Sequence, residues 1–313
     1  MANADPPRGK LSGVLFAFIA VFAFGGAARA TEGGGSGIPL GIGTVLPGVL
    51  PTPPGFNLLN YDVLYTADRL NNGRGDKAVP KFHVDVMVSS FRLDYSFAEP
   101  VAGIRFGVQF IVPFSRTNLS LGSGSAAFHK ERAGLGDINF APLVAGWEFD
   151  TPVGHVNQFA KLSLNLPTGN FKPTERVNLG RNYAAYILEQ GSSLFPTNDT
   201  HVGYFIHYLN SEKNSATNYQ SGQELDVDWS AGYDINNDWS ADVQGYFYKQ
   251  LTNDYRGGIL VNGDGNKGQA VGIGPQIRFK LHPGAISLKW QTEMAVQNRA
   301  QGNRFWLQFY YPL

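Results

Sequence analysis

The sequence predicts an all-β fold, a transmembrane antiparallel up-and-down β-barrel of about twelve strands. Three observations lead to this prediction: an export signal, segments of about ten residues in which apolar and polar residues alternate, and a low charge content. Only 16% of the 313 residues are charged, against about 25% in typical soluble domains, whereas 13% are aromatic. A surface bathed in lipid would explain this composition.

Residues 1–30 have the composition of a secretory signal peptide. Arg8 and Lys10 precede an apolar stretch at 11–24, and Ala28-Arg29-Ala30 matches a small-x-small cleavage site. The apolar stretch is shorter than the ~20 residues of a transmembrane helix, so we interpret it as a cleaved signal rather than an anchor. Residues 1–30 hold three of the 25 basic and one of the 25 acidic residues, so the mature chain would carry a net charge of −2.

The segment 31–55 is rich in glycine and proline, including Gly33-Gly34-Gly35 and Pro53-Pro54. This composition predicts an irregular leader, which we hypothesise could plug or gate the periplasmic mouth. Residues 56–313 would then form the barrel. The absence of cysteine excludes disulfide scaffolds and thiolate metal sites, and the neutral charge balance argues against nucleic acid as a partner.

Apolar and polar residues alternate with a period of two along much of the chain. Apolar residues occupy even positions over 82–88 and odd positions over 91–97, and we interpret the change of phase at Ser89-Ser90 as a β-bulge. The alternation recurs at 104–112, 160–166, 225–233, 286–290 and 305–313. These segments are longer than the ~5 to 6 residues of a sandwich strand and match a tilted strand that crosses a bilayer. A secreted β-sandwich or carbohydrate-binding module remains as an alternative if the long strands break.

The alternation and the turn residues together predict twelve strands. They are 56–66, 80–97, 103–115, 134–149, 154–166, 180–189, 199–210, 222–235, 238–251, 268–281, 284–296 and 302–312. Short connections at 98–102, 150–153, 236–237 and 282–283 alternate with long ones at 67–79, 116–133, 253–267 and 297–301. The strand at 180–189 is required by this alternation of loop lengths rather than by its own pattern. Pro275 predicts a bulge or local distortion, because proline cannot donate a ladder hydrogen bond.

Aromatic residues gather beside the predicted short turns, as an interfacial girdle at the periplasmic rim requires. They are Phe97, Trp147, Phe149, Tyr233, Trp239, Tyr310 and Tyr311.

Short motifs occur in order from about residue 46 to the C-terminus. They are Pro53-Pro54-Gly55, Gly136-Asp137-Ile138, Pro167-Thr168-Gly169, the run from Asn218 to Glu224, the run from Gln250 to Asp254, Ile273-Gly274-Pro275, and Asn298-Arg299 followed by Gly302. In this order they resemble the transporter family named for the meta-pathway of phenol degradation, a group of outer-membrane β-barrels. The resemblance implies a channel for small, often aromatic, hydrophobic compounds. The final Leu313 departs from the phenylalanine with which such barrels often end.

The sequence contains no motif that indicates an enzyme, a cofactor or a metal site. The six histidines include His129, which lies near Ser123 and Ser125 in a predicted outer loop, but no Gly-x-Ser-x-Gly elbow occurs. Asp264 lies in a fragment like a calcium loop that lacks the terminal glutamate, so a glycine-rich turn is the better interpretation. No Walker-type loop is present, so transport would run downhill.

Charged residues on the polar face of the predicted strands would project into the lumen. They are Lys161, Glu224, Asp226, Asp228, Arg278, Lys280, Lys289 and Glu293. Either these side chains pair and fill the barrel, or some of them line a narrow path and set its selectivity. We expect an outer-membrane channel of a Gram-negative bacterium for passive uptake of small hydrophobic or aromatic compounds, with lipid, solutes and the barrel-assembly machinery as partners. A closed structural barrel or a lipid-modifying enzyme is the alternative.

Overall fold

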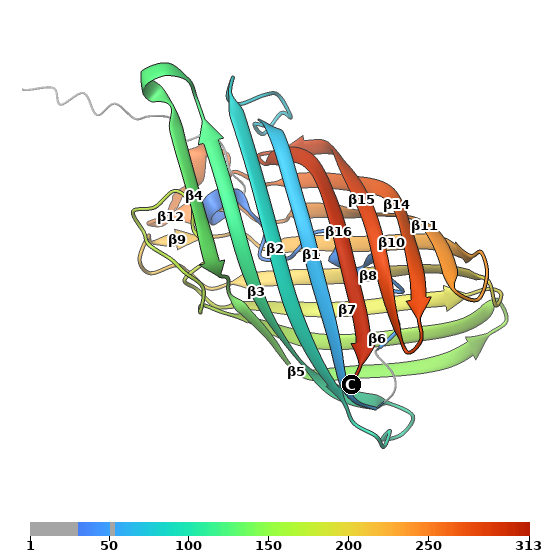
Figure 1. The fold of residues 1–313 in the computed structure, drawn as a ribbon. Coiled ribbons are helices and arrows are strands. Elements are labelled where there is room, and N and C mark those ends of the chain that lie inside the picture. Colours follow the sequence, from blue (N-terminus) through green and yellow to red (C-terminus); the bar gives the residue numbers. More distant parts are fainter. Residues whose placement is uncertain (1–30, 51–53) are drawn as a thin grey trace, which may run out of the picture.

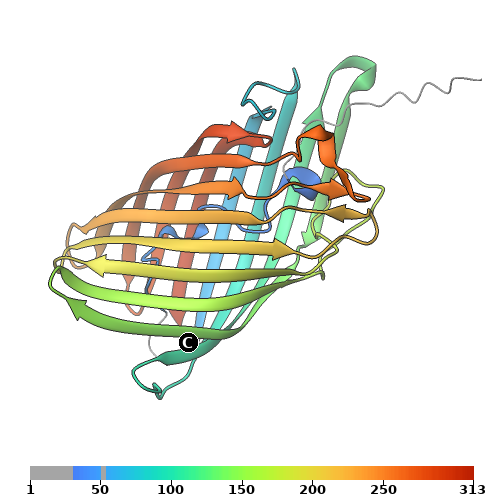
Figure 2. The ribbon, with the colours of Figure 1, turned by 180° about the vertical axis from the view of Figure 1, so that it is seen from behind.

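The computed structural model describes residues 31–50 and 54–313, and the predicted signal peptide lies outside the described residues. The described chain forms a closed antiparallel β-barrel (Figures 1 and 2). Its long strands are β1 (Gly55–Leu70), β2 (Phe82–Ser96), β3 (Arg105–Leu121), β4 (Phe128–Leu135), β5 (Ile138–Thr151), β6 (Gly154–Leu166), β7 (Ala185–Phe195), β8 (Thr200–Ser211), β10 (Glu224–Asp234), β11 (Trp239–Gln250), β14 (Gln269–Leu281), β15 (Gly284–Gln297) and β16 (Ala300–Pro312).

The barrel closes through the first and last strands. Strand β1 pairs with β16 from Asn57↔Pro312 to Leu70↔Ala300 and with β2 on its other side. Strands β4 and β5 both pair with β3 and occupy successive parts of one wall position, so the described residues form a wall of 12 strands. The strands of the front wall run steeply in Figure 1 and those behind run across it, as strong strand tilt requires. The predicted fold is confirmed.

The connections differ in length at the two ends of the barrel. Turns at 152–153, 196–199, 235–238 and 282–283 lie at the end where β1 begins and β16 ends, whereas loops at 71–81, 167–184, 212–223 and 251–268 lie at the other. Outer-membrane barrels have short periplasmic turns and longer outer loops, so we assign the short-turn end to the periplasm. The outer loops contain a small sheet of β9 (Tyr219–Gln220), β12 (Tyr255–Arg256) and β13 (Ile259–Leu260).

Two strands differ most from the sequence prediction. The strand expected at 180–189 exists, but it is β7, Ala185–Phe195, and this shift shortens the following periplasmic turn. The long loop expected at 116–133 is a protruding hairpin of β3 and β4 joined at 122–127. In both places the strand continues through serine, glycine and charged residues that carry no apolar alternation.

The β-bulge predicted at Ser89-Ser90 is wrong. Strand β2 pairs with β1 and with β3 in unbroken register from Val84 to Ser96. The change of phase arises because the strand leaves the apolar band. On the periplasmic side of Ser89, the outward side chains, such as Phe91 and Leu93, are apolar. Toward the outer end, His83 and Asp85 point outward, and Val84 is buried in a separate apolar cluster.

That cluster fills the outer extension of the wall. Its buried members are Ala67, Leu70, Phe82, Val84, Leu119 and Val177.

Two further expectations have mixed outcomes. At Pro275 the β14–β15 pairing is interrupted over residues 274–275, but the register on both sides is the same, so the distortion is present without a bulge. Among the predicted girdle residues, Phe97, Phe149, Tyr233, Trp239 and Tyr311 are exposed at the periplasmic end. Tyr310 instead turns inward, and its hydroxyl donates to Asn57 Oδ1 at 3.0 Å.

The remaining described elements are short 3₁₀ turns, η1 (Glu32–Gly34), η2 (Ile42–Thr44), η3 (Gly124–Ala126) and η4 (Val261–Gly263). Within the described ranges, no helix combines the length and apolar character required to cross a membrane.

The boundary of the apolar band on β2 can be tested with two arginine substitutions. Phe91 is 49% exposed on the outward face among apolar neighbours, so Phe91→Arg should lower the free energy of unfolding by about 2–4 kcal/mol. His83 points outward above the band, and His83→Arg should change it by less than about 0.5 kcal/mol. Urea unfolding in lipid vesicles measures both. Equal effects of the two substitutions would contradict the assigned boundary.

Candidate functional site

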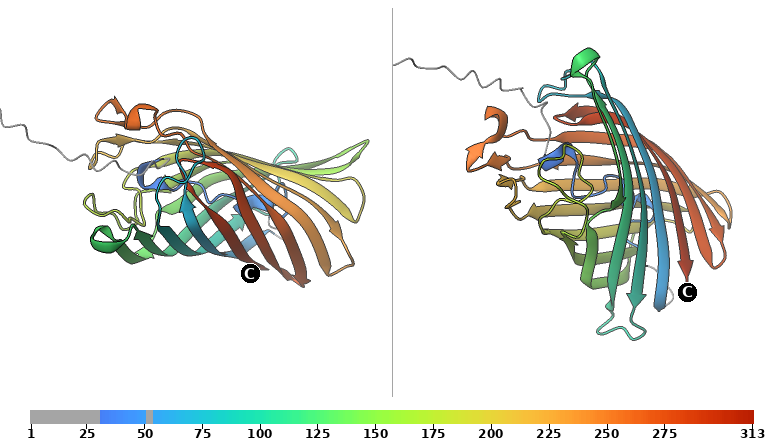
Figure 3. Two further views of the ribbon diagram at one scale, coloured as in Figure 1. Left: turned by 90° about the horizontal axis from the view of Figure 1, so that it is seen from above. Right: turned by 60° about the vertical axis from the view of Figure 1, so that its left-hand side comes forward.

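The leader, residues 31–50, runs through the lumen from the outer end to the periplasmic end. At the outer end the Glu32 amide donates to Ser221 Oγ at 3.2 Å, and near the periplasmic end the Gly48 amide donates to Ser193 Oγ at 2.9 Å. Seen from above, the blue leader lies inside the ring of strands (Figure 3). The leader therefore occupies the length of the barrel and not only its periplasmic mouth.

The glycines of the leader allow it to pass very close to the wall. A Cβ on Gly43 would lie 2.1 Å from Phe205 Cδ1, and one on Gly41 would lie 2.3 Å from Gln291 Nε2. Gly41 also has a φ of 76°, which favours glycine. The glycine content that predicted an irregular segment thus serves a close fit to the lumen.

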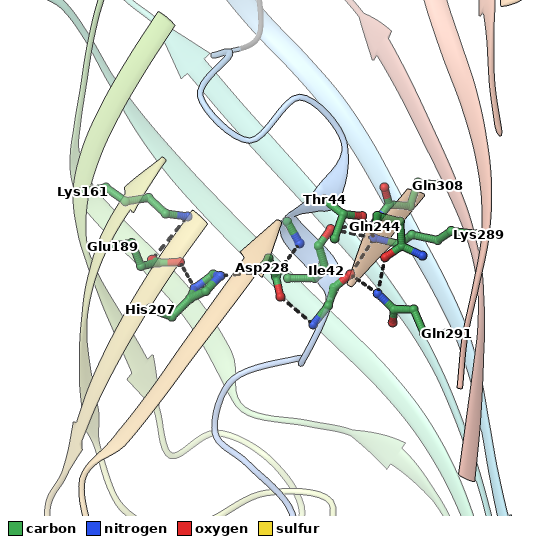
Figure 4. A network of polar contacts seen from close by, with 12 residues as sticks. Ile42, Thr44, Lys161, Glu189, His207, Asp228, Gln244, Lys289, Gln291 and Gln308 are labelled. Atoms are coloured by element: carbon green, nitrogen blue, oxygen red, sulfur yellow. Dashed lines mark hydrogen bonds and ion pairs between the residues drawn. The ribbon is translucent and has the colours of Figure 1, made fainter. Parts of the chain in front are cut away.

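Two charged side chains of opposite sign hold the middle of the leader (Figure 4). Asp228 accepts hydrogen bonds from the amides of Gly41, at 2.9 Å, and Gly43, at 2.5 Å. Lys289 Nζ donates to the carbonyls of Gly41 and Ile42 at 2.6 and 3.0 Å and to Thr44 Oγ1 at 2.9 Å. Because charged partners strengthen hydrogen bonds, these five contacts form the principal attachment of the leader.

An apolar cluster attaches the outer half of the leader. Ile38 and Leu40 are both 3% exposed and pack in one cluster with Leu209, Tyr246 and Tyr248. The two tyrosine rings come from β11 on the inner face of the wall. Apolar burial and hydrogen bonding therefore act on successive parts of the same segment.

The eight charged residues predicted to face the lumen separate into three groups. Arg278 and Lys280 lie near the periplasmic end and both pair with Asp234, at 3.3 and 3.2 Å. Asp228, Lys289 and Glu224 contact the leader, the last through Ser36 Oγ.

The third group consists of ion pairs within the wall. Lys161 Nζ lies 3.3 Å from Glu189 Oε2, and Glu293 forms an ion pair with Arg304. Glu293 also accepts from Tyr246 Oη at 2.6 Å and Tyr65 Oη at 2.9 Å. Asp226 is buried beside Asp228 and has no hydrogen-bond partner for either oxygen.

The part of the lumen wall that the middle of the leader covers is shielded from water. The inward side chains of Asp226, Asp228, Gln244 and Gln291 are all 0% exposed. A continuous aqueous path along this part of the wall would leave some of their surface accessible. The leader and these inward side chains together cover this part of the lumen.

Strand register aligns four ionisable residues in one row across the wall. Lys161 on β6 lies opposite Glu189 on β7, Glu189 lies opposite His207 on β8, and His207 lies opposite Asp226 on β10. Sequence reasoning identified the two ends of this row but missed Glu189 and His207. The inward parity of its strand was a usable signal for His207, whereas Glu189 was the last residue of the predicted strand 180–189, whose own pattern assigned no inward face.

The motifs at 218–224 and 250–254 meet in the outer loops. Asp254 accepts hydrogen bonds from Tyr219 Oη at 2.6 Å, the Gly222 amide at 2.8 Å and Gln250 Nε2 at 2.7 Å. We call this arrangement the outer-loop clasp. Ser221 lies within it and accepts the Glu32 amide, so the clasp also holds the start of the leader.

Two other motifs form a similar contact. The Gly169 amide donates to Asp137 Oδ1 at 2.9 Å, and the Ile138 amide donates to Thr168 Oγ1 at 2.9 Å. A Cβ on Gly169 would lie 2.7 Å from the Gly180 Cα, so the two backbones approach closely. The short motifs of the sequence therefore fix the outer loops against one another.

The histidine considered for enzymatic chemistry has a different neighbour from the one expected. His129 Nδ1 lies 3.0 Å from Ser120 Oγ on the exposed face of the β3–β4 hairpin, rather than beside Ser123 or Ser125. In the described part of the chain, no ion pair joins His129 to a carboxylate. In the Asp264 loop the side chain accepts the Asn266 amide at 2.9 Å, as in a turn.

Two hollows lie away from the part of the lumen that the leader covers. One, of about 520 Å³, lies among the outer loops and is lined by polar side chains that include Gln220, Gln223 and Asn253. The other, of about 500 Å³, lies over β5–β8 and is lined mainly by apolar side chains such as Leu143, Leu162 and Leu188.

The outer-loop clasp should depend on pH. Burial raises the pKa of the Asp254 carboxyl from 3.8 to about 6, although its three donors oppose the shift. The closed clasp therefore keeps a proton that the open loop releases, and its stability should fall as the pH rises from about 4 to about 6 and then level off. Protection factors for the Gly222 and Leu251 amides from hydrogen exchange measure this.

Asp254→Asn is the control for the clasp, since the amide does not titrate. Its protection factors should not change between pH 4 and pH 7. Protection that rises with pH in the unsubstituted protein would contradict the assignment.

A solved structure with a TM-score above 0.5 shares the fold. The crystal structure of the COG4313 outer membrane channel from Pseudomonas putida F1 aligns with a TM-score of 0.72 and 17% identity, over 83% of this chain and 96% of that chain. The CymD monoaromatic hydrocarbon channel aligns with a TM-score of 0.46 and 11% identity, over 92% of this chain and 98% of that chain. A search of curated proteins gave no match.

Residues 67–309 match the family described as "Putative MetA-pathway of phenol degradation". The match runs from β1 into β16 and so spans nearly the whole wall. The β-barrel fold and the similarity to an outer-membrane channel support a location in the outer membrane. This chain belongs to the MetA-pathway phenol degradation family.

Proposed function

We propose that the protein is an outer-membrane channel for passive uptake of small hydrophobic or aromatic organic compounds, exported through a cleaved signal peptide in a Gram-negative bacterium. The observation that carries the proposal is the independence of the wall from the leader. Among the described residues, the barrel sheet contains only strands from Gly55 onward, so the leader can leave the lumen without breaking a strand pair. A closed lumen becomes a passage when the leader moves.

The inner surface that the leader covers suits such solutes. Aromatic rings face inward from several strands. They are Tyr61, Phe159, Phe205, Tyr246, Tyr248 and Trp306. Sites for small organic ligands are mostly apolar with a few placed polar groups, and these rings provide apolar surface beside the charged row.

The contacts of Asp228 and Lys289 with the leader determine how often the leader leaves the lumen. Displacement exposes Asp228 and Lys289 to water or to a solute and costs the contacts listed above. Hydrogen bonds to charged groups contribute about 1.5–3 kcal/mol each, so the leader leaves only when water or a solute takes over these contacts to Asp228 and Lys289. Downhill diffusion then needs no energy source in the chain.

Removing the leader should open the channel. Deletion of residues 31–50 from the mature protein should raise both the ion conductance in planar bilayers and the uptake of phenol-like solutes into liposomes, because the strand pairing of the wall persists. Heat-modifiable mobility on gels verifies that the variant is folded. If a folded, leader-free barrel passed no more solute than the intact protein, the closed structural barrel would be the better explanation.

A single substitution tests the gate more finely. Lys289→Met removes three hydrogen bonds to the leader and should raise the open fraction by at least about tenfold, because even one hydrogen bond to a charged group contributes about 1.5–3 kcal/mol. Lys280→Met is the matched control, since Lys280 also faces inward but pairs with Asp234. Single-channel recording reports the open fraction. Identical traces for the two variants would argue against a gating role for the leader.

A further inference from the structure

A cluster of three metal-ligating side chains lies in the wall of the lumen, and only one of them, Asp228, also contacts the leader. His207 on β8 and Asp226 and Asp228 on β10 each offer one ligand atom, and these atoms lie within 4.8 Å of one another. The residues are 3%, 0% and 0% exposed. Three strongly polar side chains are thus removed from water at one point of the lumen.

The hydrogen bonds around His207 determine which ring nitrogen is available. His207 Nδ1 lies 2.9 Å from Glu189 Oε1, and a carboxylate can only accept, so Nδ1 carries the proton. In the neutral ring, Nε2 then presents a lone pair toward Asp228 Oδ2 at 3.8 Å. A histidine held by a carboxylate in this way is the usual arrangement of a histidine that ligates a metal.

Acceptor atoms without donors converge at this point. His207 Nε2 and both oxygens of Asp226 are buried and have no hydrogen-bond partner. Buried polar groups without partners are costly, and two adjacent carboxylates add charge repulsion. A bound cation would give a partner to the His207 nitrogen and the Asp226 carboxylate and would offset the repulsion between the two carboxylates.

The nearby basic side chains are directed elsewhere. Lys161 Nζ lies 3.3 Å from Glu189 and donates to Gln109 at 3.0 Å. Lys289 donates to the leader, and Arg304 forms an ion pair with Glu293. The positive charge that the cluster requires is therefore not supplied by these three residues.

We propose that His207, Asp226 and Asp228 form a binding site for a divalent transition-metal ion of the zinc class. One imidazole and two carboxylates suit such ions. Ligand atoms around a tetrahedral zinc ion are about 3.3 Å apart, so the ligand atoms approach one another by up to about 1.5 Å on binding. Glu189 accepts the hydrogen bond from His207 Nδ1 and so orients the imidazole ring.

The site shares one ligand with the gate. Asp228 accepts the amides of Gly41 and Gly43 and also lies in the cluster, so the ion and the leader contact the same carboxylate. Metal affinity is nevertheless a property of the folded barrel and is measured without any transport assay. Failure of the channel proposal and failure of the metal proposal are therefore separate results.

The test uses the mature protein without a histidine tag, folded in detergent and stripped with a chelator. Titration with Co²⁺, followed by its visible absorption, and competition with Zn²⁺ against a chromophoric chelator should give one ion per chain. Because they remove a ligand, His207→Ala and Asp226→Asn should each weaken binding by about 100-fold or more. Glu189→Gln should weaken it by about 10- to 100-fold through the orientation of His207.

His201→Ala is the matched control. His201 is also a buried inward histidine bonded to a carboxylate, Asp242, at 2.6 Å, but it lies outside the cluster. Its removal should leave the affinity unchanged, and heat-modifiable mobility verifies the folding of each variant. Absence of stoichiometric binding, or binding that His207→Ala leaves unchanged, would overturn the proposal. A doubly protonated His207 in a metal-free protein that binds no Co²⁺ would assign the balancing charge to a proton instead.

Discussion

The structure depends on the requirement that every backbone N–H and C=O group in a lipid environment finds a partner within the protein. Closure of β1 on β16 satisfies this requirement for the whole wall and removes the open sheet edges. Closure also creates an interior, which twelve strands make wider than their own inward side chains need. The leader occupies that interior, so its position is a consequence of the size of the barrel.

The same requirement explains why the sequence predicts the wall well. Lipid on one face and a polar lumen on the other impose alternation with a period of two, and this alternation yielded the fold, the strand number and the inward orientation of residues such as Asp226 and Lys289. It fails where the surroundings change. At Ser89-Ser90 the outward face passes from lipid to water, so the pattern reverses while the backbone continues unchanged.

The leader and the row of ionisable residues were harder to predict. Glycine-rich sequence carries no periodicity, so its composition suggested flexibility, although Gly41 and Gly43 are required for close contact with Gln291 and Phe205. The juxtaposition of Glu189 with His207 depends on a register across β7 and β8, and the strand predicted at 180–189 carried no alternation that would assign Glu189 to its inward face. Register is set by pairing between strands, which a single strand's pattern does not contain.

The path of the leader also constrains the order of assembly. Its beginning lies at the outer end of the lumen, whereas β1, which follows it, starts at the periplasmic end. The seam between β1 and β16 joins the segments that are translated first and last in the barrel, so the wall cannot seal until synthesis is complete. A segment of twenty residues must therefore be laid along the interior before the seam forms, or be threaded through a finished cylinder afterwards. If the leader is enclosed while the barrel closes, it needs only to lie alongside the growing sheet. In that order of events the leader is a template around which the last strands pair.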